Sequence, residues 1–184
     1  MPHIVIKSLK LGLWVILPLV FISNTSTEVK SDKTVLSAGS YVLNVAGENE
    51  FQLQGIINFE TAIMRSSKGQ EYTILKLSLN DGQKLPGHSL GFFISKQYHS
   101  TKIGNGRHEI SGNIEGFLNY FDGVFGFANI NQFGELPFFA KNGAITIDNI
   151  DDKILKGNIH VVFENLNEAD FEVTGNFIAQ KNSF

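Results

Sequence analysis

Residues 154–179 read ILKGNIHVVFENLNEADFEVTGNFIA, and this stretch decides the fold class. Apolar residues recur at every second position on both sides of a short polar segment, 165–170. A period of two residues is typical of β-strands that bury one face. Together with a further strand expected at 144–150 and an acidic turn at 151–153, the pattern predicts a three-stranded antiparallel meander.

The same alternation continues upstream of the meander. Strands are expected at 41–46, 51–59, 72–79, 90–95 and 108–114, and turns at 66–69, 80–82 and 104–106. No stretch keeps the i, i+3, i+4, i+7 apolar spacing of a helix for three turns. We therefore predict a single all-β domain over 40–184, an antiparallel sandwich or barrel-like roll of eight to ten strands with very little helix. A polar segment, 27–39, is expected to be a flexible lead-in to this domain.

The first 26 residues have the composition of a secretory signal peptide. Lys7 and Lys10 precede twelve uncharged residues, 11–22, and small polar residues follow at 23–26. Twelve residues span about 18 Å as a helix, which is shorter than the roughly 30 Å hydrocarbon layer of a bilayer. We therefore expect cleavage and export to the periplasm, the cell surface or the medium; an uncleaved anchor is the alternative.

Charge and cysteine content narrow the class of partner. Lys7 and Lys10 are the only charged residues before position 27, so cleavage changes the net charge from −3 to −5. Arg65 and Arg107 are the only arginines, and no basic stripe is present. Nucleic acid is therefore not an expected partner. The chain has no cysteine, so its stability must come from its core rather than from disulfides.

The C-terminal meander resembles a pattern found in small exported bacterial β-proteins of unknown function. The residues that carry the resemblance are 142–147, 154–159 and 171–177, within residues 142–179. In words the family pattern is G-x-I-T-I, an acidic turn, I-x-G-x-F, a loop and V-T-x-G-x-F. Ile159 stands where phenylalanine is usual, and the lipid-attachment cysteine of the surface lipoproteins is missing. The resemblance implies an exported antiparallel β-domain and brings no catalytic residue with it.

Phenylalanine and glycine are concentrated between residues 116 and 139. Phe133, Phe138 and Phe139 flank Gly134 and Pro137, which indicates a long loop at an open end of the β-structure. The favoured interpretation of the segment is core, because phenylalanine commonly fills the space between sheets. If the protein binds an apolar ligand or an envelope partner protein, we expect these three side chains to contact it.

Residues 87–91 spell Gly-His-Ser-Leu-Gly, the G-x-S-x-G pattern of a serine esterase. That nucleophile needs a strand before Ser89 and a helix after it. A loop precedes this segment and a strand-forming sequence follows it, so a turn entering a strand is the favoured interpretation. An esterase that uses Ser89 stays an alternative.

The remaining residues indicate no cofactor and no metal. The histidines lack the spacing of paired ligands, and Asp148, Asp151 and Asp152 do not follow the order of a calcium loop. We therefore expect a non-enzymatic binding or structural component of the bacterial cell envelope, without stable membrane insertion after cleavage. The length also suits an eight-stranded outer-membrane barrel, but the chain is poor in the aromatic residues that form interfacial girdles.

Overall fold

The computed structural model describes residues 35–84, 87–98, 103–111 and 122–182. The described residues belong to one compact unit, Thr34–Phe184. The strands of this unit are β1 (Ser40–Ala46), β2 (Phe51–Arg65), β3 (Glu71–Asn80), β4 (His88–Gln97), β5 (Gly106–Glu109), β6 (Gly123–Ile130), β7 (Phe138–Ile150), β8 (Ile154–Glu164) and β9 (Asp170–Lys181). A short 3-10 turn, η1 (Asn131–Phe133), is the one helical element among the described residues.

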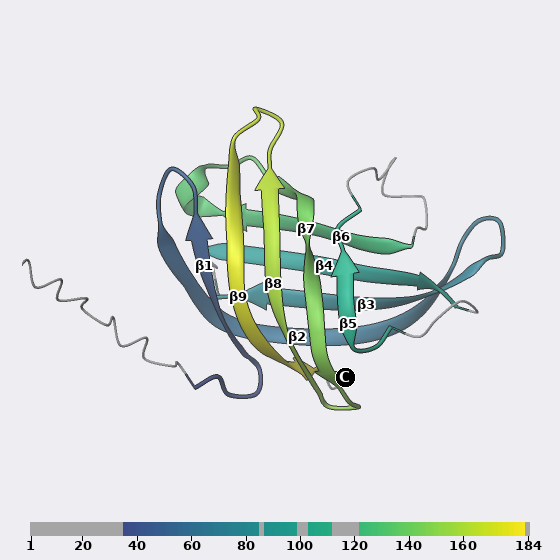
Figure 1. The fold of residues 1–184 in the computed structure, drawn as a ribbon. Coiled ribbons are helices and arrows are strands. Elements are labelled where there is room, and N and C mark those ends of the chain that lie inside the picture. Colours follow the sequence, from purple (N-terminus) through teal and green to yellow (C-terminus); the bar gives the residue numbers. More distant parts are fainter. Residues whose placement is uncertain (1–34, 85–86, 99–102, 112–121, 183–184) are drawn as a thin grey trace, which may run out of the picture. The chain divides into compact units, whose positions relative to one another are not determined.

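The strands form a closed antiparallel barrel (Figure 1). Neighbours around the barrel follow the order β1, β2, β3, β4, β6, β7, β8 and β9, and β9 pairs with β1 to close it. β5 is an additional strand beside β7. The prediction of an all-β fold with eight to ten strands is therefore confirmed, and the structure decides for a barrel rather than a sandwich.

β5 fills a gap in the barrel wall. β6 and β7 pair only at two positions, Phe127 with Phe139 and Ala128 with Phe138. Further along β7, residues 106–109 take the place of β6. The chain after β5 then hydrogen-bonds to both neighbours, because the Ile110 amide donates to the Gly143 carbonyl and the Ser111 amide donates to the Val124 carbonyl, both at 2.9 Å.

β2 belongs to two halves of the barrel and bends between them. β1 pairs with the first part of β2, from Phe51 to Ile56, whereas β3 pairs with the second part, from Ile56 to Arg65. Figure 1 shows β1, β9, β8 and β7 running upright across β6, β4, β3 and the second part of β2. The bend lies beside Gly55, where a Cβ atom would come within 2.1 Å of the Asn80 carbonyl oxygen. Only glycine lets the two strands approach this closely.

Apolar side chains fill the barrel interior. Alternate residues of most long strands point inward and are buried, as the sequence pattern predicts, although the last five residues of β2 are exposed. Phe163 lies at the centre of the packing, with ring centroids 5.9 Å from Phe92 and 5.2 Å from Phe171. An eight-stranded barrel is just wide enough for side chains to fill its interior or for one small ligand. Here side chains fill it, so a ligand must bind at an opening of the wall.

Several predicted boundaries need correction. β7 begins at Phe138, six residues before the predicted start, because its first residues pair with β6 and β8 and the sequence near Pro137 reads locally as a loop. Phe138 and Phe139 are therefore in a strand and not on the predicted long loop. β2 and β4 are also longer than predicted, and β5 begins at Gly106. The predicted signal peptide lies outside the described residues.

Candidate functional site

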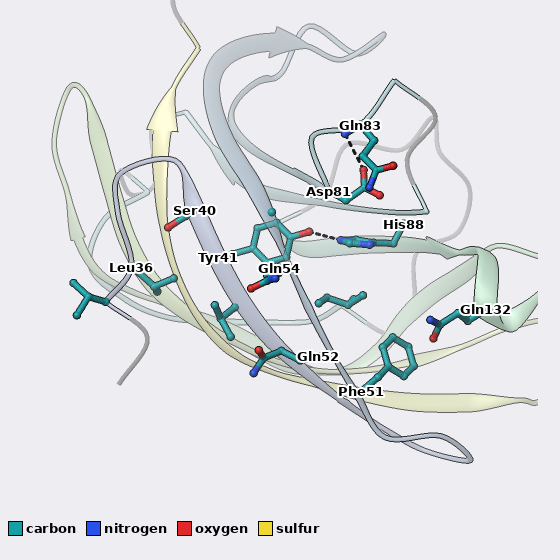
Figure 2. A pocket seen from close by; sticks show the side chains of 14 residues that line it. Leu36, Ser40, Tyr41, Phe51, Gln52, Gln54, Asp81, Gln83, His88 and Gln132 are labelled. Atoms are coloured by element: carbon teal, nitrogen blue, oxygen red, sulfur yellow. Dashed lines mark hydrogen bonds between the residues drawn. The ribbon is translucent and has the colours of Figure 1, made fainter. Parts of the chain in front are cut away.

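A groove opens where β2 bends, between the first part of β2 and the ends of β3 and β4 (Figure 2). Its volume is about 650 Å³. The walls carry an unusual number of amide side chains for so small a space. The lining residues include Ser40, Tyr41, Phe51, Gln52, Gln54, Asp81, Gln83, His88 and Gln132.

A hydrogen bond between Tyr41 and His88 closes the inner end of the groove. The Tyr41 hydroxyl and His88 Nε2 are bonded, although the two residues are 47 positions apart. Tyr41 lies at the start of β1 and His88 at the start of β4, so the bond joins opposite halves of the barrel. The rings meet edge to face with centroids 6.2 Å apart. Tyr41 is only 1% exposed, so its hydroxyl needs this partner.

Asp81 is fixed beside this pair by the backbone of its own loop. Its carboxylate accepts hydrogen bonds from the Gly87 amide at 2.7 Å and the Gln83 amide at 3.0 Å. These backbone donors, helped by the nearby His88, lower the pKa of Asp81. The carboxylate is therefore ionised at neutral pH and gives the groove a fixed negative charge.

The protonation states of Tyr41 and His88 follow from their surroundings. Burial, with a smaller contribution from the Asp81 charge, raises the pKa of Tyr41. Burial lowers the pKa of His88 from its usual 6.5, and Asp81 opposes that shift. At neutral pH the pair is therefore a neutral phenol and a neutral imidazole. The imidazole can accept the Tyr41 hydrogen at Nε2, which leaves Nδ1 as a donor.

Backbone groups of β2 also face the groove. The Ile57 amide donates to the Gly39 carbonyl on the β1 side, so the odd-numbered residues of β2 direct their backbone groups toward β1. The even-numbered residues direct theirs to the other side, where β3 pairs with β2 only from Ile56 onward. The N–H and C=O groups of Gln52 and Gln54 therefore point into the groove, and no described residue pairs with them.

The three phenylalanines predicted to bind a ligand do not lie together on one surface. Phe138 is 2% exposed and packs with Phe133 and Phe171, at centroid distances of 5.7 and 4.9 Å. Phe139 points to the opposite face of β7 and packs against Phe125. Phe133 is half-buried and also contacts Phe51, which lines the groove. Ligand binding by these residues stays a prediction, but only Phe133 adjoins the groove.

Ser89 lies within β4 rather than at a strand-to-helix elbow. Its side chain and that of His88 point to opposite faces of the strand, since neighbouring residues alternate. His108 bonds to the Gly104 carbonyl, and His160 pairs with Glu172, while His99 lies outside the described residues. The geometry around Ser89 therefore offers no support for the esterase alternative.

Sequence reasoning missed Tyr41, Asp81 and His88 as a group. Tyr41 and His88 occupy inward positions of their strands, where a polar side chain needs a buried partner, and this signal could have marked them. Within the described residues, no group of three or more histidine or acidic side chains is arranged to hold a metal ion. None of the described helical structure is long and apolar enough to cross a bilayer.

Comparisons with known proteins give no match to a protein-family model, to a curated protein or to a solved structure.

Proposed function

We propose that this chain is an exported, non-enzymatic binding protein of the bacterial cell envelope, and that its ligand occupies the groove beside Tyr41 and His88. The single observation that carries the binding role is the groove itself. It combines a fixed carboxylate, a neutral imidazole and several amides with unpaired backbone groups of β2. Export rests on the basic, apolar and small residues of positions 1–26.

Binding fits the chemistry of the groove better than catalysis. Each polar group there can donate or accept a hydrogen bond, but none is an activated nucleophile. Asp81 bonds to backbone amides of its own loop, so it does not serve His88 as the acid of a catalytic triad does.

The outer-membrane barrel is the second candidate, favoured by the closed eight-stranded wall. A membrane barrel carries apolar side chains outside and polar ones inside. In this barrel most inward residues are apolar, whereas outward residues such as Gln52, Gln54 and Lys156 are exposed. This distribution supports the first candidate. Release of the protein by osmotic shock without detergent would support it further, and a need for detergent would contradict it.

Binding is tested by nuclear magnetic resonance with three probe mixtures: a tryptic digest of casein, malto-oligosaccharides and short-chain fatty acids. We expect at least one mixture to shift the resonances of Tyr41, Gln52, Gln54 and His88. Hydrolysis of short acyl esters, abolished by Ser89→Ala, would instead support the esterase. If no mixture shifts the groove resonances, the proposed binding site is wrong.

A further inference from the structure

We infer that the groove binds an extended polypeptide segment, which adds to the free edge of β2 at residues 51–54 as one more strand of the sheet. This inference rests on the proposed binding role of the groove and names its ligand class. Three observations carry it: the direction of the β2 backbone groups, the size of the groove, and the nature of the groups that surround it.

The first observation is the spacing of the unpaired backbone groups. Gln52 and Gln54 each present one N–H and one C=O to the groove, and residues two apart in a strand lie about 6.8 Å from each other. An extended polypeptide repeats its own donors and acceptors at this same interval. A second strand can therefore satisfy all four groups at once, in the manner of other peptide-binding sheet edges. Four hydrogen bonds of this kind specify an extended backbone, whatever its side chains.

The second observation is the volume of the groove. A strand beside four residues of β2 is about 14 Å long, occupies about 4.8 Å of sheet width and is about 10 Å thick with its side chains. These dimensions correspond to roughly 650 Å³. The groove holds about 650 Å³, which is enough for one strand of about four residues and not for a folded element.

The third observation concerns the groups that face β2 across the groove. Asp81, Gln83 and Gln132 line the far wall, and amide side chains there can bond to the outer edge of an added strand.

The free edge is short, as sheet edges in natural proteins usually are. Phe51 closes one end of this edge, because its ring packs on Phe133 of η1 with the ring centroids 5.6 Å apart. At the other end β3 begins to pair with β2 at Ile56. The bounds of the edge therefore set the length of the segment that can bind.

The experiment uses peptides selected from a displayed random heptapeptide library on the full folded chain, and then synthesised. Binding is measured to the unaltered protein, to Gln54→Ala and to Gln54→Pro. Proline removes the amide that faces the groove, a substitution that edge strands accept, whereas alanine keeps that amide and removes only the side chain. We expect Gln54→Pro to weaken binding at least tenfold and Gln54→Ala to weaken it less than threefold.

Hydrogen exchange and modified peptides provide checks that do not depend on how the variants fold. In the free protein the amides of Gln52 and Gln54 should exchange faster than those of Leu53 and Gly55, which face β1. A bound peptide should slow the exchange of Gln52 and Gln54. N-methylation at alternate peptide positions should abolish binding, and N-methylation at the intervening positions should have little effect.

Three outcomes would overturn the inference. The first is equal loss of binding in Gln54→Ala and Gln54→Pro, which would mean recognition by the side chain. The second is slow exchange at Gln52 and Gln54 in the free protein. The third is a groove that responds to malto-oligosaccharides or fatty acids but not to peptides. In that third case the groove would still be a binding site, so the proposed function would stand while the peptide inference failed.

Discussion

At the scale of single residues, His88 links the groove to pH. Its pKa is lowered by burial, so the folded protein favours the neutral imidazole, whereas the unfolded chain titrates near the usual 6.5. The unfolded state therefore binds more protons as the pH falls through this range. The stability that neutral His88 contributes is complete above about 6.5 and is lost as the pH falls through the folded-state pKa.

We therefore predict that the free energy of unfolding decreases when the pH falls from 7.5 to 5. Urea denaturation at a series of pH values measures this decrease. His88→Gln keeps a side chain that can bond to Tyr41 but cannot titrate, so it should reduce the pH dependence. Asp81 does not interfere in this window, because its lowered pKa places its titration at lower pH. If the free energy of unfolding of His88→Gln depends on pH as strongly as that of the unaltered protein, His88 is not the residue responsible for the pH dependence.

A second residue-scale prediction concerns Gly55. A Cβ atom there would overlap the Asn80 carbonyl oxygen at 2.1 Å, so Gly55→Ala must push β3 away from the bend in β2. We expect a loss of about 1–3 kcal/mol in the free energy of unfolding, the usual cost of overpacking. Gly87→Ala is the matched control, because its Cβ would meet only Asp81 Oδ2, at 3.4 Å. Equal thermal denaturation midpoints for the two variants would disprove the close approach.

At the scale of elements, the start of β7 places Phe138 in the core and its neighbour Phe139 on the outer face of the strand. Phe138→Ala removes a ring that packs with Phe133 and Phe171, so it should cost about 3–5 kcal/mol. Phe139→Ala, on the opposite face, should cost clearly less, because Phe139 is only half-buried. Urea denaturation of both variants checks this order. The reverse order would mean that the outer face of β7 is the one that supports the fold.

The elements also show which parts of the fold could be predicted from sequence. Ile154–Glu164 was predicted with its bounds because alternation over eleven residues is a strong local signal. The start of β7 was not predicted. Phe138 and Phe139 adopt an extended conformation because they pair with β6 and β8, whereas Gly134 and Pro137 nearby indicate a loop. Pairing partners far away in the sequence decided that boundary, and local preference could not.

The site was less predictable than the strands. Tyr41 meets His88 only because β2 bends at Gly55 and brings the starts of β1 and β4 to the same opening. Alternation in the sequence places both side chains inward, but it does not determine which inward residues face each other. The order of strands around the barrel determines that, and no local pattern encodes it.

At the scale of the whole barrel, the first and last strands are neighbours. The Gly39 amide donates to the Ile178 carbonyl at 2.7 Å, so the two ends of the described barrel lie together. We predict that a circular permutant, with residues 182 and 35 joined by a short Gly-Ser linker and new ends between Lys68 and Gly69, folds to the same barrel. That turn is exposed, and a Cβ at Gly69 would touch nothing. An unchanged β-type circular dichroism spectrum with cooperative unfolding checks this; loss of either would contradict it.

The pairing of β1 with β9 also imposes an order of events on a newly made chain. β1 can complete its hydrogen bonds only after residues 172–178 have been synthesised, because those residues are its partners. Until then the strand lacks one neighbour, and the barrel has a gap along its whole length. Contacts between such distant segments slow folding. A chain of this topology therefore stays open throughout its synthesis and can close its barrel only when the last strand has been made.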